Sequence, residues 1–222
     1  DVAVGINQAQ ASGLINAGLQ FADDDTVTLN ATTTAGTHLS TSLKDLQKLG
    51  VDAVAIAGAA AGQDLSVELG AGALSATGLP TFASGLDVTL NLDSTQVGEL
   101  TVPGMAAALE GHGIDHLNIN VLDADAAGTL GAGFANELNS LLGTPGLGSL
   151  NGVGGANLDV TLDMGGNADV AVGINQAQAS GLINAGLQFA DDDTVTLNAT
   201  TTAGTHLSTS LKDLQKDRKS VV

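Results

Sequence analysis

The sequence contains no cysteine, tryptophan or tyrosine, and only four phenylalanines among its 222 residues. The absence of cysteine excludes disulfides and thiolate zinc sites. With aromatics at 2 %, the core has to be built from Leu, Val, Ile and Ala, and the chain has few of the large side chains that dominate tight interfaces. Hydrophobic residues still make up 43 %, which is too apolar for a disordered chain.

Basic residues are also scarce: six Lys and Arg stand against 24 Asp and Glu, for a net charge of −18. A surface this acidic repels nucleic acid and anionic membranes and attracts cations. No run of 18 apolar residues appears, so we expect no membrane insertion. The absence of cysteine also suits a protein that a bacterium exports unfolded. Asp1 is not a start methionine and no signal peptide is visible, so we expect a fragment of a longer protein.

A long internal repeat is the dominant feature of the sequence. Residues 1–48 recur as residues 169–216 without a single substitution. We interpret residues 1–168 as one full tandem period and residues 169–216 as the start of the next, identical repeat. After Lys216 the sequence departs abruptly from the first copy, and this stretch holds the only Arg. We therefore expect residues 217–222 to be a non-native tail, which comparison with the parent gene would test.

Periodicity predicts strands that alternate with helices. The expected strands are 27–30, 51–56, 65–69, 87–92, 114–121 and 158–162, and the expected helices are 6–21, 38–49, 103–109 and 134–142. Thr37 or Ser40 is expected to cap the second helix, and Pro103 to stand in the first turn of the third. Gly50, Gly113 and Gly143 are expected to end helices, Gly50 in the left-handed conformation.

A shorter similarity lies inside the period. Residues 26–52 match residues 87–115 in the order strand, loop, helix, Gly, branched residue, Asp, strand, so the unit is β-α. A helix that joins two strands usually makes a crossover between parallel neighbours. Several strands place Val and Leu on one face and Thr, Asn and Asp on the other, so helices would cover one side only.

The expected fold class is therefore α/β, with repeated β-α units in an open, one-sided parallel sheet or an α/β solenoid. A string of globular two-layer domains, one per period, is the next possibility. An all-β sandwich comes third, because the segment 39–49 does not have the pattern of a strand.

The candidate metal ligands are carboxylates in acidic turns. Asp23, Asp24 and Asp25 follow the first predicted helix, and three carboxylates at a helix C-terminus are unfavourable unless a cation offsets them. Calcium takes carboxylate and carbonyl oxygens and is the one candidate cofactor. The alternative is a solvated acidic loop. The remaining candidates are the copies and one further pair: Asp191, Asp192, Asp193, Asp123 and Asp125.

No pattern predicts catalysis. His112 and His116 are four residues apart but are separated by a Gly cap and a strand start, so His112 is expected to end a helix. Nucleophile-elbow and phosphate-loop motifs are absent. Identical tandem copies add length and avidity more readily than they improve a catalytic site, so we expect no enzyme.

A second candidate is a polar sheet face that could bind sugars or ordered water; the alternative is a merely soluble outer face. Its expected members are Thr28, Asn30, Thr89, Asn91, Asn118, Asn120 and Thr161.

The long identical repeats, the acidic cysteine-free composition and the Val-Thr-Leu-Asn strands resemble the repeat regions of giant secreted bacterial surface proteins of the adhesin-like class. This resemblance implies an extracellular stalk or adhesive array, often stiffened by calcium, in which neighbouring repeats of the same chain are the partners. The first functional hypothesis is therefore a non-catalytic structural segment. The second is a repeat module that gives avidity for cell-surface glycan, and an enzyme is the third.

Overall fold

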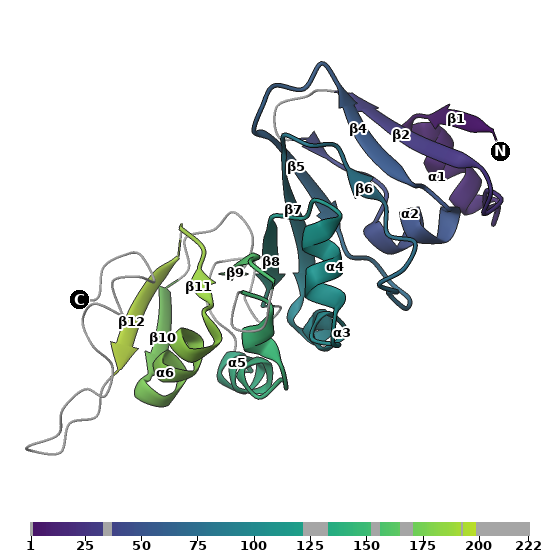
Figure 1. The fold of residues 1–222 in the computed structure, drawn as a ribbon. Helices are drawn as coiled ribbons and strands as arrows, with labels where there is room; N and C mark the ends of the chain where they lie inside the picture. Colours follow the sequence, from purple (N-terminus) through teal and green to yellow (C-terminus); the bar gives the residue numbers. More distant parts are fainter. Residues whose placement is uncertain are drawn as a thin grey trace, which may run out of the picture. The chain divides into compact units, whose positions relative to one another are not determined.

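The computed structural model describes residues 2–32, 37–121, 133–151, 156–164, 171–191 and 193–198 (Figure 1). The chain divides into two compact units. The first comprises Asp1–Leu92 and Val102–Leu117, and the second comprises Asp93–Thr101 and Asn118–Val222. Each unit is described by itself below. Among the described residues, each helix is too short or too polar to span a bilayer.

The first unit contains a four-stranded sheet in the order β1-β2-β4-β6. All three neighbouring pairs are parallel. Its strands are β1 (Ala3–Ile6), β2 (Thr26–Thr32), β4 (Ala53–Ala57) and β6 (Thr81–Phe82).

The other strands of this unit follow the order β3-β5-β7-β8. The pairs β3–β5 and β5–β7 are parallel. From β2 to β7 the chain visits the two sheets alternately, so within this stretch no two consecutive strands belong to the same sheet. The bounds are β3 (Thr37–His38), β5 (Gln63–Glu68), β7 (Leu86–Asp93) and β8 (His116–Asn120).

Three helices accompany these strands: α1 (Gln8–Asn16), α2 (Leu43–Leu49) and α4 (Met105–Gly111). Gly50 ends α2 in the left-handed conformation with φ 81°, as predicted. The predicted N-cap was wrong: Ser42 caps α2, because Thr37 belongs to β3 and Ser40 lies two residues before Ser42. Pro103 was also misplaced, since it precedes the Gly104 N-cap of α4.

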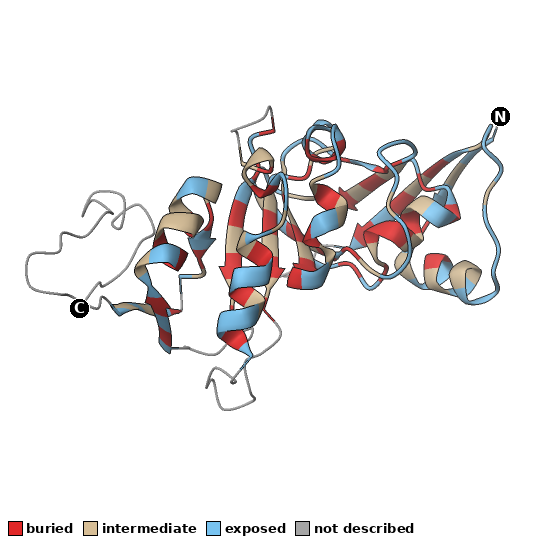
Figure 2. Cartoon of the chain, turned by 90° about the horizontal axis from the view of Figure 1, so that it is seen from below, coloured by how far each residue is buried: buried red, intermediate tan, exposed pale blue. Residues whose placement is uncertain are grey.

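Burial alternates along the strands as the sequence predicted (Figure 2). In β7, Val88, Leu90 and Leu92 are buried, whereas the residues between them are only half-buried. Leu, Val and Ile supply most of this core, and burying each such side chain contributes on the order of 2 kcal/mol. The apolar side of each strand therefore holds the unit together and leaves the polar side free for other contacts.

In the second unit, the strand order is β8-β9-β11, and β10 pairs with β12 in parallel. The helix α5 (Phe134–Leu142) has the predicted bounds and ends at Gly143. It lies against α6 (Gln176–Ala185). The remaining elements are β9 (Asp159–Asp163), β10 (Ala171–Asn175), β11 (Gln188–Phe189), β12 (Thr194–Asn198), η1 (Ser94–Gln96), α3 (Val97–Leu100) and η2 (Leu147–Ser149).

In the part of the two copies that the structure describes, β1, α1 and β2 correspond to β10, α6 and β12. The strands β1 and β2 pair with Ala3 opposite Thr26, and β10 and β12 pair with Ala171 opposite Thr194, which is the corresponding residue pair. Each copy also begins its helix with a capping box, formed by Asn7 and Gln10 in the first and by their counterparts in the second. The first part of each copy is thus a β-α-β unit.

These observations confirm an α/β fold with parallel sheets, and the all-β alternative was wrong because helices connect the strands. The predicted helix 6–21 was too long: α1 ends at Asn16, because Gly18 has φ 69° and turns the chain away.

Candidate functional site

The outward side of the β3-β5-β7-β8 strands is a polar surface within the first unit. Its side chains alternate with the buried residues of the same strands, and the register places His38 opposite Ser66, Asp64 opposite Asp87 and Glu68 opposite Asn91. We call this surface the polar face. Its members are His38, Asp64, Ser66, Glu68, Asp87, Thr89, Asn91 and His116.

Polar contacts connect neighbouring strands across this face. His38 Nδ1 lies 2.9 Å from Ser66 Oγ. Asn91 donates from Nδ2 to Glu68 Oε1 at 3.0 Å. Each contact fixes the two side chains relative to each other, so the polar face presents a set of positioned oxygen and nitrogen atoms.

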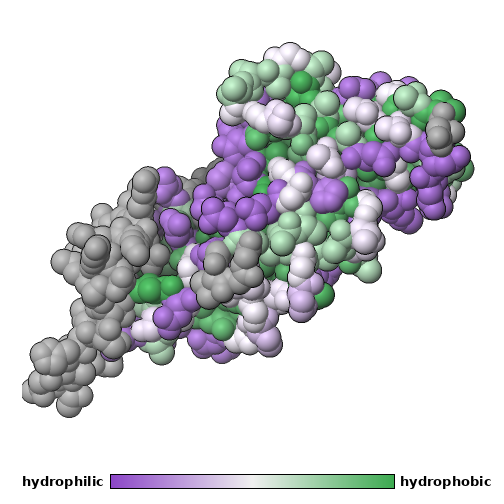
Figure 3. Space-filling model, viewed as in Figure 1, coloured by the Kyte–Doolittle hydropathy of each residue, from purple (hydrophilic) through white to green (hydrophobic). Residues whose placement is uncertain are grey.

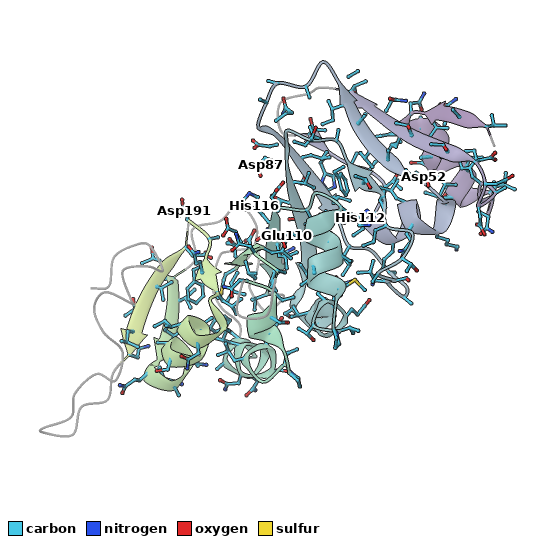
Figure 4. The ribbon with its side chains drawn as sticks, in the orientation of Figure 1. Asp52, Asp87, Glu110, His112, His116 and Asp191 are labelled. Carbon is cyan, nitrogen blue, oxygen red and sulfur yellow. The ribbon has the colours of Figure 1, made fainter. Side chains whose placement is uncertain are left out.

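The His116–Asp87 pair is the shortest of these contacts, with Nε2 2.7 Å from Oδ1. The two side chains are 38 % and 44 % exposed, so the pair contributes little to stability but remains open to a ligand. Figure 4 shows both side chains beside β7 and β8, and Figure 3 shows hydrophilic residues gathered over the same part of the unit.

The structure separates the seven polar residues that the sequence grouped. Thr89 and Asn91 lie on β7, but Thr28 and Asn30 lie on β2, where their parallel neighbours are Ala53 and Ala55. No polar ladder forms there because the neighbouring side chains are methyl groups. Asn120 ends β8, and in the second unit Asn118 donates from Nδ2 to Asp163 Oδ2 at 3.1 Å, with Thr161 on the same strand as Asp163.

Two aspartates that the sequence analysis did not assign hold the beginnings of strands. Asp52 Oδ2 accepts the N–H of Val27 at 2.7 Å, while Asp52 N–H donates to Val27 O at 2.9 Å. Asp115 does the same with Val88, at 3.0 and 2.9 Å. The partners are 25 and 27 residues apart. Each Asp therefore connects the end of a β-α segment to the strand with which that segment begins.

Asp25, a predicted calcium ligand, makes a related contact. Its Oδ1 accepts the N–H of Val2 at 3.1 Å, and the next residue, Thr26, donates its N–H to Val2 O at 2.9 Å. One carboxylate of this acidic turn therefore joins β2 to the chain just before β1.

The other candidate metal ligands divide into exposed, buried and undescribed residues. Asp23, Asp24 and Asp191 are exposed, and Asp193 is buried. Asp192, Asp123 and Asp125 lie outside the described residues. The expected position at a helix end was wrong, because α1 ends seven residues before Asp23 and the turn leads into β2. Within the described ranges, no cluster of three or more His, Cys, Asp or Glu has the arrangement of a metal site. Calcium therefore stays a prediction.

Phe21 and Phe82 occupy equivalent positions that the sequence analysis also missed. Phe21 donates its N–H to Leu49 O at 2.9 Å, and Phe82 donates to His112 O at 2.8 Å. Each acceptor precedes a left-handed glycine that ends a helix, so each Phe amide satisfies a carbonyl at that end. The available signal was a shared pattern in which four residues separate Phe-Ala from Val-Thr-Leu-Asn.

His112 is the C-cap of α4, as predicted, and its Nδ1 lies 3.1 Å from Thr81 Oγ1. His116 belongs to β8, so the two histidines do not share a helix, which also confirms the expectation. His112 therefore has a structural contact away from the polar face, whereas His116 lies on that face.

No protein-family model matches the chain, and neither a curated protein nor a solved structure shows significant similarity to it.

Proposed function

We propose that the chain is a non-catalytic structural repeat segment of a large extracellular bacterial surface protein and acts as a stalk or adhesive array. The observation that carries this proposal is the exact 48-residue duplication, whose two copies form the same β-α-β unit. A duplicated unit that keeps the same order of strand, helix and strand is suited to building length. A catalytic site gains little from such copying.

The recurring contacts support a finer proposal about architecture, in which repeated β-α units stack in an open parallel sheet or α/β solenoid. The Asp52–Val27 and Asp115–Val88 contacts have the same geometry, and the Phe21 and Phe82 contacts repeat with them. Repeats that bury their apolar side only against neighbours favour such stacking. The neighbouring repeats of the same chain are then the main partners.

The proposal is tested with proteins that contain one, two and three periods of 168 residues. Small-angle X-ray scattering measures the maximum dimension of each. A stalk predicts an equal increase in length for every added period. A maximum dimension that does not grow with copy number would refute the proposal.

The alternative is a ligand-binding repeat module that gives avidity for glycan or for a surface. The polar face favours it, because His116, Asp87, Glu68 and Asn91 present donors and acceptors on an accessible sheet. A glycan array with the 222-residue chain tests it, with H116A and D87A as variants and H112A, which changes a histidine away from that face, as the control. Loss of a signal in the first two variants alone would support the module, and no signal with the unchanged chain would refute it.

A further inference from the structure

The two identical copies differ in what covers their apolar side chains. Leu19 is 57 % exposed, whereas its counterpart Leu187 is 1 % exposed. Val4, Leu14 and Phe21 are half-buried in the first copy, and all three counterparts are buried. The counterparts are Val172, Leu182 and Phe189. Since the sequences are identical, the difference comes from the surroundings and not from the residues.

Two other apolar residues of the repeat are buried equally in both copies. Ile6 and Ile174 are 5 % and 4 % exposed, and Ala11 and Ala179 are 0 % and 2 % exposed. These side chains are covered in either setting. Val27 and Leu29 differ in the opposite direction: both are 0 % exposed, whereas their counterparts Val195 and Leu197 are half-buried. The apolar residues that are less covered in the first copy are Val4, Leu14, Leu19 and Phe21, and we call them the open face.

In the second copy, the corresponding face is covered by the residues that precede it. The helix α5 lies against α6, and η2 also contacts α6. A Cβ added at Gly181 would lie 3.1 Å from Leu142 Cδ1, whereas one at Gly13 would meet nothing within 4 Å. Gln178 donates from Nε2 to Asn139 Oδ1 at 3.2 Å, which adds a polar contact to this packing.

A strand completes the cover. In the second copy Gln188 and Phe189 form β11 and pair in parallel with Thr161 and Leu162 of β9. Ala190 also donates its N–H to Leu162 O at 2.8 Å. In the first copy the corresponding residues 20–21 form no strand. The same two residues thus form a strand only in the copy in which β9 lies beside them.

We propose that the open face is a docking surface for α5, η2 and β9 of a preceding identical period, which would cover it as the same elements of this chain cover the second copy. This inference rests on the proposed tandem array and specifies how its periods join. The occupant is a second copy of the same segment, because the chain itself contains that complex with an identical sequence. Docking would bury Leu19, order residues 20–21 as an edge strand and remove apolar surface from water.

The test compares the 222-residue chain with the same chain extended at its N-terminus by residues 133–168. Because the protein has no cysteine, L19C, L187C and V102C each introduce a single thiol. In the unextended chain, we expect L19C to react rapidly with a thiol reagent and L187C slowly. In the extended chain, L19C should slow by roughly tenfold or more, since reaction then requires local opening.

V102C is the control, because Val102 is 54 % exposed and lies outside the repeat; its rate should not change. Equal L19C rates in the two chains would overturn the inference. Concentration-dependent protection of L19C in the unextended chain would also overturn it, since it would assign the face to association between separate chains.

Hydrogen exchange gives a readout that needs no substitution. The Ala22 amide corresponds to the Ala190 amide that donates to Leu162 O, so extension should increase its protection. A blocking variant, G13L in the extended chain, should restore rapid L19C labelling because Leu142 of the docked segment would meet the new side chain. Unchanged exchange at Ala22 would contradict docking.

Thiol labelling and scattering together distinguish a failure of the docking inference from a failure of the proposed function. If L19C stays reactive in the extended chain while the scattering dimension still grows with copy number, the stalk stands and its periods are linked without docking. If neither measurement changes, both proposals are wrong.

Discussion

An amide near the start of a strand needs an acceptor, and an aspartate side chain supplies it at Val27 of β2 and Val88 of β7. Val27 and Val88 are fully buried, so water cannot easily replace the carboxylate as the partner of these N–H groups. A buried donor left without a partner costs about 1–3 kcal/mol. The aspartates therefore fix where adjacent strands begin.

Replacing Asp115 by Ala tests this role. We expect D115A to lower the free energy of unfolding of the first unit by about 1–3 kcal/mol, because the Val88 amide loses its acceptor. D115N should cost less, since the amide oxygen can still accept. Urea unfolding measures both, with D64A, an exposed position of β5, as the control. An equal effect of D115A and D64A would contradict the assignment.

Gly113 is a second position at which one residue determines the backbone conformation. It has φ 87°, and an added Cβ would lie 3.3 Å from Phe82 O. G113A should destabilise by about 1 kcal/mol or more, since L-residues are strained in this conformation. The matched control is G111A, at the end of α4, where an added Cβ meets nothing within 4 Å. Thermal melting of the two variants checks the difference, and similar melting temperatures would show that the glycine is dispensable.

At the scale of elements, long periodic segments could be predicted and short ones could not. The bounds of α5 follow from the spacing of Phe134, Leu138 and Leu141, which are all buried. The strands β3 and β6 have two residues each, too few to show alternation, and depend on their neighbours for pairing. The N-cap Ser42 was missed for the same reason, because recognising it requires knowing that β3 ends at His38.

The matched glycines of α1 and α6 provide a prediction at this scale. G13A should stabilise the chain by about 0.5–1 kcal/mol, because alanine favours a helix and the site is open. G181A should gain less or destabilise, since its methyl group approaches Leu142 Cδ1 to 3.1 Å. Denaturant unfolding of the two variants measures the difference between identical sequences in two surroundings. Equal gains would contradict the packing of α6 against α5.

The candidate site could be predicted only in part. Alternation along β7 correctly indicated that Thr89 and Asn91 share one polar side. The sequence could not show that Thr28 and Asn30 belong to a different sheet, because that depends on the alternation of the chain between sheets. His116 and Asp87 were not grouped either, since they are 29 positions apart in the sequence and only strand pairing brings them within 2.7 Å.

For the whole molecule, the net charge of −18 sets the response to cations. If the acidic turns bind calcium, saturation at a hundredfold over Kd adds about 2.7 kcal/mol and raises the melting temperature by a few degrees. We predict this rise for the unchanged chain and its loss in a D23N/D24N/D191N variant, which leaves the Asp25–Val2 contact in place. Sodium chloride at equal ionic strength controls for screening of the negative charge. An equal rise in both salts would exclude a specific site.

The exact correspondence of the two copies also has a consequence for inheritance. Two stretches of identical sequence are places where misaligned recombination adds or deletes one complete period of 168 residues. After such an event, every repeat is still flanked by the same sequence as before. The contacts between neighbouring periods therefore need no new substitutions. If the chain belongs to the proposed array, the length of that array can change by whole periods without any change in the chemistry of its parts.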